Sequence, residues 1–403
     1  MSKKVNNNVP KLRFPEFEGD WNEIAISSIG EVIRGASPRP KGDTRYYGGK
    51  IPRLMVEDVS RDGKHVTPRT DFLTEEGAKL SRPCEKGTLT IVCSGTVGIP
   101  SFLAVDACIH DGFLAIKKLK KEIIYDDFLY HQLTILRNVF ESSATHGGVF
   151  TNLTTEILRN FKIKSTSIAE QEKIASFLGA IDTRITQLRR KHELLQTYKR
   201  GVMQKLFSQQ IRFKCDRGKP FPDWEEKKLG SFIEEYSKKS TIQDEYEVLT
   251  SSRNGLLPQR QYYDNERITE RDNIGFNIIL PNLVTYRSRS DDRLFFFNEN
   301  KLGFTGIISN YYPVFRFKNG INKFFIEFLH YNQNYIGQYS VGTSQTVLSL
   351  NELRKINFKI PSLKEQEKIA DFLTAIDKKI EAIAQQIDWT EQFKKGLLQK
   401  MFV

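Results

Sequence analysis

Two stretches of the chain carry apolar residues at repeated steps of three and four positions. Such spacing places the apolar side chains along one side of a helix, in the pattern of a coiled-coil seam. A helix with one apolar side needs a covering partner, and each stretch offers the other a matching seam. The pattern therefore predicts two long helices that pack on each other through Ile174, Phe177, Ile181, Ile185, Leu188, Ile369, Phe372, Ile376, Ile380 and Ile383.

The rest of the chain has a different pattern, in which short apolar runs alternate with turn residues. Residues 87–105 contain two β-rich runs joined around SGTVG, which predicts a turn between strands. Residues 126–140 and 323–336 have helical spacing, and the first of them begins with Asp, a common residue at helix starts. Residues 20–165 and 208–360 are thus predicted to be two regions of short strands that each contain a helix.

The two helical stretches are copies of one another. The segment Glu170–Phe207 returns as Glu365–Phe402, 195 residues later and without a gap, and 17 of 38 positions are identical. A less similar pair of segments, which we call the lead-in segments, precedes the strand-rich regions. Their sequences are LRFPEFEGDW at 12–21 and IRFKCDRGKPFPDW at 211–224. Self-similarity at a fixed period indicates a tandem duplication. The strand-rich regions differ from each other, whereas the helices that follow them are nearly the same.

The apolar pattern and the duplication together predict an α+β protein with an internal pseudo-two-fold repeat. Two globular regions of mixed strands and helices, residues 12–165 and 209–360, are expected to be separated by two long antiparallel coiled-coil helices, residues 166–208 and 361–403. A 38-residue helix is about 57 Å long, because each residue advances the helix by about 1.5 Å. Such helices can hold two domains at a fixed separation.

Charge adds a class of partner to this picture. The 403 residues include 61 Lys and Arg against 49 Asp and Glu, which gives a net charge of +12. This excess favours an anionic partner, with nucleic acid ahead of an anionic membrane surface. No run approaches the roughly 18 apolar residues that a membrane span needs. The four cysteines form no CxxC pair, so a disulfide framework is not expected and a reducing cytoplasm fits the chain.

The sequence lacks the motifs expected of an enzyme that modifies or cleaves nucleic acid. No Asn precedes Pro, so the NPP[YFW] signature of amino-methyltransferases is absent, and no GxxxxGK[ST] phosphate loop occurs. Cys84, Cys93, Cys108 and His110 have suitable atoms for zinc, but without a paired CxxC the cysteines are expected to be buried thiols. We therefore expect no catalytic residue and no metal site in this chain.

Candidate nucleic-acid contacts gather on the predicted loops. Lys and Arg neutralise phosphates, whereas Arg, Asn, Gln, Ser and Thr can read base edges in the major groove. Each residue alone is more often a solvated loop residue, and their clustering on loops of a rigid scaffold favours binding. The candidates of the first region are Ser37, Arg39, Lys41, Arg45, Tyr46, Ser94, Thr96, His146, Phe150, Thr151 and Asn152. Those of the second region are Ser252, Arg253, Asn254, Gln259, Arg260, Gln261, Tyr262, Arg287, Arg289, Thr343, Ser344, Gln345 and Thr346.

This combination of motifs resembles the specificity (S) subunits of type I restriction–modification systems. The resemblance rests on the RFPEF…W lead-in, on the G-x-x-x-T-x-L…LR pattern before each long helix, and on the EQEKIAxFLxAID motif that begins at Glu170 and again at Glu365. It extends over essentially the whole chain, including the LLQKMF sequence at its end.

The resemblance implies that each strand-rich region is a target recognition domain that reads one half of a split, asymmetric DNA sequence. The two helices would set the unread spacer and bind two modification (M) subunits, and motor/nuclease (R) subunits would complete the complex. In such complexes the S subunit carries no catalytic residue. The M subunits transfer methyl groups from S-adenosylmethionine to adenine, and the R subunits use ATP and Mg²⁺. The chain itself is then expected to bind no cofactor and to work in the cytoplasm.

A different class of function is also compatible with the residues. A non-catalytic scaffold protein whose basic surface docks an acidic protein partner would show the same charge and the same helices. Sequence preference in DNA binding separates the two alternatives, because a specific reader exceeds its own non-specific binding by orders of magnitude.

Overall fold

The computed structural model divides the chain into two compact units. The first unit comprises residues 8–189 with 385–403, and the second comprises residues 190–384. Each unit mixes strands with helices, which confirms the α+β prediction. For residues 145–147, 150 and 151 the structure describes the backbone alone. The described residues are 8–143, 145–147, 150–216, 218–263, 272–318, 321–343 and 345–403.

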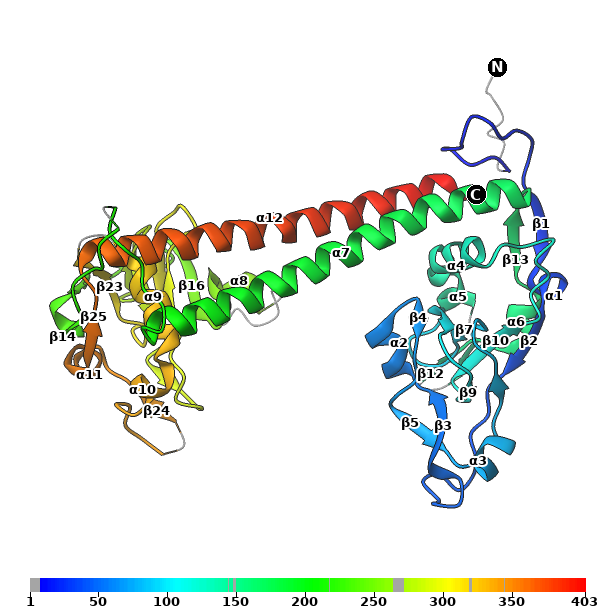
Figure 1. The fold of residues 1–403 in the computed structure, drawn as a ribbon, viewed down its shortest axis with the longest axis horizontal. Helices are drawn as coiled ribbons and strands as arrows, with labels where there is room; N and C mark the ends of the chain where they lie inside the picture. Colours follow the sequence, from blue (N-terminus) through cyan, green and yellow to red (C-terminus); the bar gives the residue numbers. More distant parts are fainter. Residues whose placement is uncertain are drawn as a thin grey trace. The chain divides into compact units, whose positions relative to one another are not determined.

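A five-stranded and a four-stranded sheet form the body of the first unit (Figure 1). The five-stranded sheet has the order β2-β10-β7-β8-β4, with β2 (Glu31–Arg34), β4 (His65–Val66), β7 (Leu89–Val92), β8 (Pro100–Leu103) and β10 (Phe113–Lys117). The four-stranded sheet has the order β5-β3-β9-β6, with β3 (Tyr47–Leu54), β5 (Asp71–Leu73), β6 (Pro83–Cys84) and β9 (Ala107–Ile109). Because β3 pairs in parallel with β9 and aligns Leu54 with Ile109, both strands end at the same edge of this sheet.

Short helices and two small ladders complete the first unit. Antiparallel pairing joins β1 (Asn22–Ala25) to β13 (Lys162–Ser165), and β11 (Thr145–Gly147) to β12 (Phe150–Asn152). The predicted helix over residues 126–140 is divided into two helices, α4 and α5. The helices are α1 (Ile26–Ile29), α2 (Val56–Asp62), α3 (Glu75–Lys79), α4 (Asp126–Ile135), α5 (Arg137–Ser143) and α6 (Thr155–Asn160).

The second unit contains two four-stranded sheets. The first has the order β15-β23-β19-β21, with β15 (Ile233–Glu235), β19 (Val284–Tyr286), β21 (Phe297–Glu299) and β23 (Val314–Phe317). The second has the order β17-β16-β22-β18, with β16 (Glu247–Ser252), β17 (Gly255–Pro258), β18 (Asn277–Ile279) and β22 (Gly306–Ile308). Smaller ladders join β14 (Glu225–Lys228) to β25 (Asn357–Ile360) and β20 (Arg289–Ser290) to β24 (Thr346–Val347). The short helices are η1 (Leu229–Ser231), α8 (Gln259–Tyr262), α9 (Asn322–Tyr331), α10 (Gln333–Gly337) and α11 (Leu350–Lys355).

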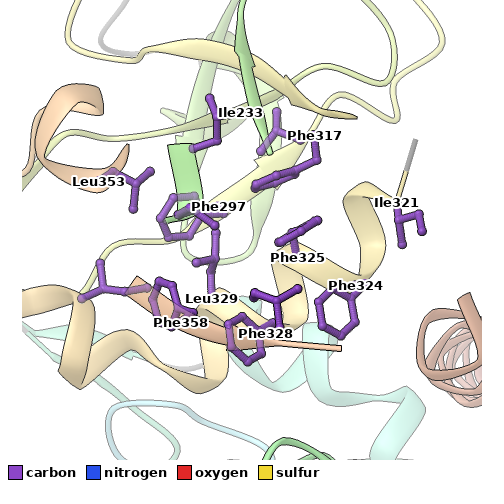
Figure 2. Packing of buried hydrophobic residues seen from close by; sticks show 14 of the residues in the cluster. Ile233, Phe297, Phe317, Ile321, Phe324, Phe325, Phe328, Leu329, Leu353 and Phe358 are labelled. Carbon is purple, nitrogen blue, oxygen red and sulfur yellow. The ribbon is translucent and has the colours of Figure 1, made fainter. Parts of the chain in front are cut away.

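The core of the second unit is rich in phenylalanine. Figure 2 shows Phe324, Phe325 and Phe328 of α9 among apolar side chains that come from the strands. The ring of Phe325 stacks on Phe317 of β23 with centroids 4.3 Å apart, and Phe328 meets Phe358 of β25 edge-on at 5.2 Å. Each fully buried aromatic side chain stabilises the fold by about 1.5–3 kcal/mol relative to exposure. This helix is therefore held to the strands mainly by its aromatic side.

Two helices are far longer than the others, α7 (Ile168–Phe207) and α12 (Leu363–Met401). Each helix runs without a break from residues of one unit into residues of the other, because the units divide between residues 189 and 190 and between residues 384 and 385. Among the helices that the structure describes, none is both long and apolar enough to cross a membrane.

Ion pairs between α7 and α12 follow the internal repeat. In the first unit, Asp182 of α7 pairs with Lys394 of α12, and Arg189 pairs with Glu391 at 2.7 Å. A later residue of one helix thus meets an earlier residue of the other, so the helices are antiparallel in this unit. In the second unit, Lys199 of α7 pairs with Asp377 of α12 at 2.8 Å. The Asp182–Lys394 and Asp377–Lys199 pairs use equivalent positions, because each partner lies 195 residues from its counterpart.

Most of the predicted seam residues are covered. Phe177 differs, because it is exposed and its ring meets Phe14 of the lead-in edge-on, with centroids 5.7 Å apart. Its counterpart Phe372 makes the same contact with Phe213 at 5.5 Å. The prediction that Phe177 packs against the other long helix is therefore wrong, because this side chain packs on the lead-in segment instead. Ile181, Phe372 and Ile380 are half-buried, and the fully buried members are Ile174, Ile185, Leu188, Ile369, Ile376 and Ile383.

The two lead-in segments make the same contact with the long helices. Arg13 donates two hydrogen bonds to the carboxylate of Glu170, both at 2.7 Å, and Glu170 is 1% exposed. Arg212 donates two to the equally buried Glu365, at 3.1 and 2.8 Å. Removing one partner of such a pair costs about 3–5 kcal/mol, because it leaves a buried charge uncompensated. The two lead-in segments, although only loosely similar in sequence, thus hold equivalent glutamates of the two long helices through the same kind of ion pair.

Candidate nucleic-acid interface

The first unit has a small polar cavity, which we call the first pocket, beside the loop that follows β2. Its volume is about 250 Å³. The end of β2 with the loop after it, the two ends of β3, the turn after β7 and the turn after β9 each contribute to it. Its lining consists of Arg34, Ser37, Arg39, Lys41, Tyr47, Arg53, Ser94, His110, Asp111 and Gly112.

The first pocket collects four of the predicted contact residues, Ser37, Arg39, Lys41 and Ser94. The other first-region candidates whose side chains the structure describes, Arg45, Tyr46, Thr96 and Asn152, lie outside its lining. Arg45 is occupied by a two-pronged ion pair with Asp43 and lies over the ring of Tyr46, whereas Thr96 is exposed. Asn152 accepts a hydrogen bond from Arg34 at 3.3 Å, so it supports a residue of the pocket. The side chains of His146, Phe150 and Thr151 lie outside the part of the chain that the structure describes.

Several residues of the first pocket were not among the predicted contacts. They are Arg34, Tyr47, Arg53, His110, Asp111 and Gly112. Two signals in the sequence could have identified some of them. Arg53 interrupts the short apolar run at residues 51–56, and a charged residue in such a place is seldom buried without a partner. His110, Asp111 and Gly112 follow directly on the apolar strand β9, where Asp-Gly marks a turn.

Asp111 is the centre of a hydrogen-bond network in the first pocket. Its Oδ1 atom accepts from the hydroxyl of Ser37 at 2.9 Å and lies 2.9 Å from Nε2 of His110. Its Oδ2 atom lies 3.5 Å from the guanidinium of Arg39. Burial alone would raise the pKa of Asp111, but the hydrogen bond from Ser37, with the guanidinium of Arg39, outweighs it and holds that pKa below the usual range. The carboxylate is therefore ionised at neutral pH.

The network rests on a buried arginine. Arg53 is 3% exposed, and its Nε atom donates to Asp71 at 2.6 Å while another guanidinium nitrogen donates to Ser37 at 3.1 Å. Nδ1 of His110 accepts from the backbone N–H of Gly112 at 2.9 Å, which leaves Nε2 to carry the proton toward Asp111. Burial lowers the pKa of His110, so its neutral form prevails at pH 7. The first pocket therefore holds its carboxylate in a fixed position.

The second unit has a larger cavity, which we call the second pocket, with a volume of about 890 Å³. It contains six predicted contact residues, Gln259, Arg260, Tyr262, Arg287, Arg289 and Gln345. The remaining lining is Gln243, Asp244, Tyr246, Glu247, Val248, Leu249, Thr250, Ser251, Tyr263, Asn273, Phe276, Ser309, Tyr311 and Tyr312. The guanidinium of Arg289 stacks over Tyr311 at 3.9 Å from the ring centroid, and Arg260 pairs with Glu247 at 3.1 Å. The lining thus contains several tyrosines, of which only Tyr262 was predicted from the sequence.

The other second-region candidates that the structure describes lie outside the lining of the second pocket. Thr346 is buried, and its hydroxyl donates to the carbonyl of Ser290 at 2.9 Å, so its role is structural. Arg253 forms an ion pair with Asp292. Ser252 accepts from the backbone N–H of Asn254 at 3.1 Å, which makes these two residues part of the β16–β17 turn. Gln261 and Thr343 are exposed, and Ser344 lies outside the described residues.

Comparison with known proteins places this arrangement in a family. Residues 18–196 and 222–391 each match the type I restriction modification DNA specificity domain. Two proteins of Methanocaldococcus jannaschii are similar over nearly their whole length. The type I restriction enzyme MjaVIII specificity subunit is 24% identical over 96% of this chain and 92% of its own. The putative type I restriction enzyme MjaX specificity subunit is 24% identical over 97% and 95%.

Solved structures share the fold. The S subunit of a type I restriction–modification system from M. genitalium has a TM-score of 0.59 at 15% identity, and the match covers 98% of this chain and 99% of that one. A chain from a study of complex assembly and conformational transition of the type I R-M system has a TM-score of 0.57 at 16% identity, over 95% and 97%. The predicted fold class is confirmed by these matches. The family match and the similar specificity subunits give no support to the scaffold alternative.

The two matched domains cover most of the chain and coincide with the two copies of the repeat. Specificity subunits are the DNA-recognising, non-catalytic parts of complexes that also contain M and R subunits. The resemblance seen in the sequence is therefore confirmed. The chain belongs to the family of type I restriction–modification specificity subunits and carries two DNA specificity domains.

Proposed function

We propose that the chain reads a bipartite, asymmetric DNA sequence, with residues 12–165 and 209–360 as its two target recognition domains. The observation that carries this proposal is the contrast between the two pockets. The first is lined by cationic side chains around one carboxylate, and the second by tyrosines, amides and arginines. Different linings present different donors and acceptors to base edges, so the two units read different sequences. Joint binding is strong because the second contact becomes intramolecular.

Exchanging residues 12–165 for the corresponding domain of another family member tests this proposal. One half of the methylated sequence is expected to change, while the other half and the spacer stay the same. The measurement is a map of methylated adenines in the genome of cells that produce the chain with its methyltransferase partner. The unexchanged chain in the same cells is the control. A change in both halves would contradict independent reading by two domains.

We further propose that residues 166–208 and 361–403 set the spacer and dock two methyltransferase subunits. Leu194 and Tyr198 of α7 are exposed apolar residues one helical turn apart. Trp389 and Phe393 of α12 occupy the equivalent positions, and the four side chains are between 51% and 66% exposed. An apolar pair on the outside of a helix favours a protein partner. Because the same pair recurs in the repeat, it supports two copies of one partner.

Placing acidic residues in either pair is expected to remove one methyltransferase subunit from the complex. The double change Trp389→Asp with Phe393→Asp removes two large apolar side chains that would be buried against the methyltransferase subunit. The expected result is about a 100-fold loss of affinity for that subunit. Leu194→Asp with Tyr198→Asp removes the other subunit, and the combined variant removes both. Native mass spectrometry gives the stoichiometry. Ala384→Asp with Gln399→Asp is the control, because both residues are exposed on α12 and add the same charge elsewhere on its surface. Full occupancy in the combined variant would exclude this docking surface.

We propose that the chemistry lies entirely on partner chains. The M subunits would hold S-adenosylmethionine, and the R subunits would hold ATP and Mg²⁺. Within the described residues of this chain, no three His, Cys, Asp or Glu side chains are grouped so as to hold a metal ion. A complex of this kind acts on genomic DNA, which supports the cytoplasm as its location.

A further inference from the structure

We propose that Arg39 and Asp111 together read one G·C base pair in the half-site bound by the first unit. This inference rests on the proposed function and adds the identity of a base pair to it. Both residues line the first pocket, and they come from the loop after β2 and the turn after β9. A cationic fork and a fixed acceptor thus stand side by side at the pocket.

The two residues differ in how firmly they are held. Asp111 is fixed through Oδ1 by Ser37 and His110, and its backbone carbonyl accepts from Arg34 at 3.1 Å. Arg39 has a side chain that is 73% exposed, and its contact with Oδ2 of Asp111 is long, at 3.5 Å. Charge-assisted hydrogen bonds are normally about 2.7–2.9 Å. The fork of Arg39 therefore retains donors for a ligand, and Oδ2 of Asp111 can accept one from the same ligand.

The major-groove edge of a G·C pair matches this arrangement. Guanine presents two adjacent acceptors, N7 and O6, which suit the two-pronged fork of an arginine. Cytosine presents the N4 amino donor next to them, which suits a carboxylate. An A·T pair offers no two adjacent acceptors on one base, so Arg39 could not bind it with both prongs. Arg39 is therefore assigned to guanine and Asp111 to the paired cytosine.

A phosphate group fits the same place less well. The ionised carboxylate of Asp111 lies within 3.5 Å of the guanidinium of Arg39 and would repel a phosphate bound there. Lys41 is an exposed residue of the first pocket and, unlike Arg39, forms no ion pair with a described carboxylate, so it is better suited to the DNA backbone. The carboxylate thus favours base reading over backbone binding at Arg39.

The test compares methylation maps from cells that produce the methyltransferase partner with wild-type, Asp111→Asn or Arg39→Gln chains. The wild-type half-site assigned to the first unit by domain exchange is expected to contain an invariant G·C pair. Asp111→Asn is expected to reduce discrimination at that one pair by about 10- to 100-fold. Arg39→Gln is expected to shift the preference there toward adenine, because an amide pairs with adenine N6 and N7. Retained preference at the other positions of the first half-site shows that the first unit of each variant is folded.

Arg69→Gln is the matched control. Arg69 also makes a long contact with an aspartate, 3.4 Å from Asp62, and is similarly exposed, but it lies outside the first pocket. The methylation map of the Arg69→Gln chain is expected to equal that of the wild-type chain. The inference is overturned if the first half-site lacks an invariant G·C pair, or if both pocket variants weaken methylation uniformly without changing base preference. Methylation without any sequence preference by the wild-type complex would overturn the proposed function as well.

Discussion

Lengthening both long helices by seven residues is expected to add about three base pairs to the spacer and to leave both half-sites unchanged. Seven residues keep the coiled-coil seam in phase and extend a helix by about 10 Å, close to the rise of three base pairs. Insertion after Lys191 of α7 and after Gln386 of α12 uses equivalent positions of the repeat, just beyond each boundary between the units. The ion pairs between the two helices within each unit are then retained.

The expected methylation level of the lengthened chain is lower than that of the wild type. Three additional base pairs rotate one half-site by about 100° relative to the other, since the duplex turns once in about 10.5 base pairs. Genome-wide mapping of methylated adenines gives both the spacer and the level. Lys191→Ala with Gln386→Ala is the control, because it changes the same positions without changing length. An unchanged spacer in the lengthened chain would show that these helices do not determine the spacing.

A chain that stops after Ser208 is expected to dimerise and to direct methylation of a symmetric sequence made of the first half-site twice. The core of the first unit in the full chain includes Leu397 and Met401 of α12 and Phe402, which follows that helix. The equivalent positions of α7 are Val202, Leu206 and Phe207, and the last two are buried in the second unit. In the shortened chain, each copy can supply these three residues to the other.

The charge pairs of the long helices supply a control for this dimer. Lys199 would replace Lys394 as the partner of Asp182 across the dimer, because it holds the equivalent position. Lys199→Asp is then expected to weaken dimerisation by about tenfold or more, and adding Asp182→Lys is expected to restore it. Sedimentation analysis measures the association, and methylation mapping measures the symmetry. A shortened chain that stays monomeric, or that directs methylation of the original asymmetric site, would contradict this prediction.

The long helices were predictable from the sequence because their signals are local. The steps of three and four around Ile174 and Ile369 depend only on neighbours along the helix, and the duplication repeats them. The same steps could not show what covers each residue. Phe177 follows the seam spacing, yet it packs on Phe14, which lies far away in the sequence. Helical periodicity identifies the covered side of a helix, and the covering segment depends on the tertiary fold.

The first pocket was predictable only in part because distant strands assemble it. Arg39 and Ser94 stood out as polar residues on predicted loops. Arg53 and Asp111 both reach the first pocket because β3 pairs in parallel with β9, and pairing between distant strands leaves no local periodic signal. Thr346 was predicted to contact DNA because it is a polar residue in a polar stretch, but its side chain is buried. Its pairing partner Ser290 takes its hydroxyl into a buried hydrogen bond.

The burial of Phe402 in the first unit has a consequence for the order of folding during synthesis. The rings of Trp21 and Phe128 pack against Phe402, with centroids 6.1 and 5.1 Å away. The ribosome makes all of residues 190–384 between these two parts of the core. The second unit can therefore fold first. The first unit emerges earlier from the ribosome, but its core is complete only after the end of α12 has been synthesised. Proteolytic trimming near Phe402 would accordingly loosen the unit that was synthesised first.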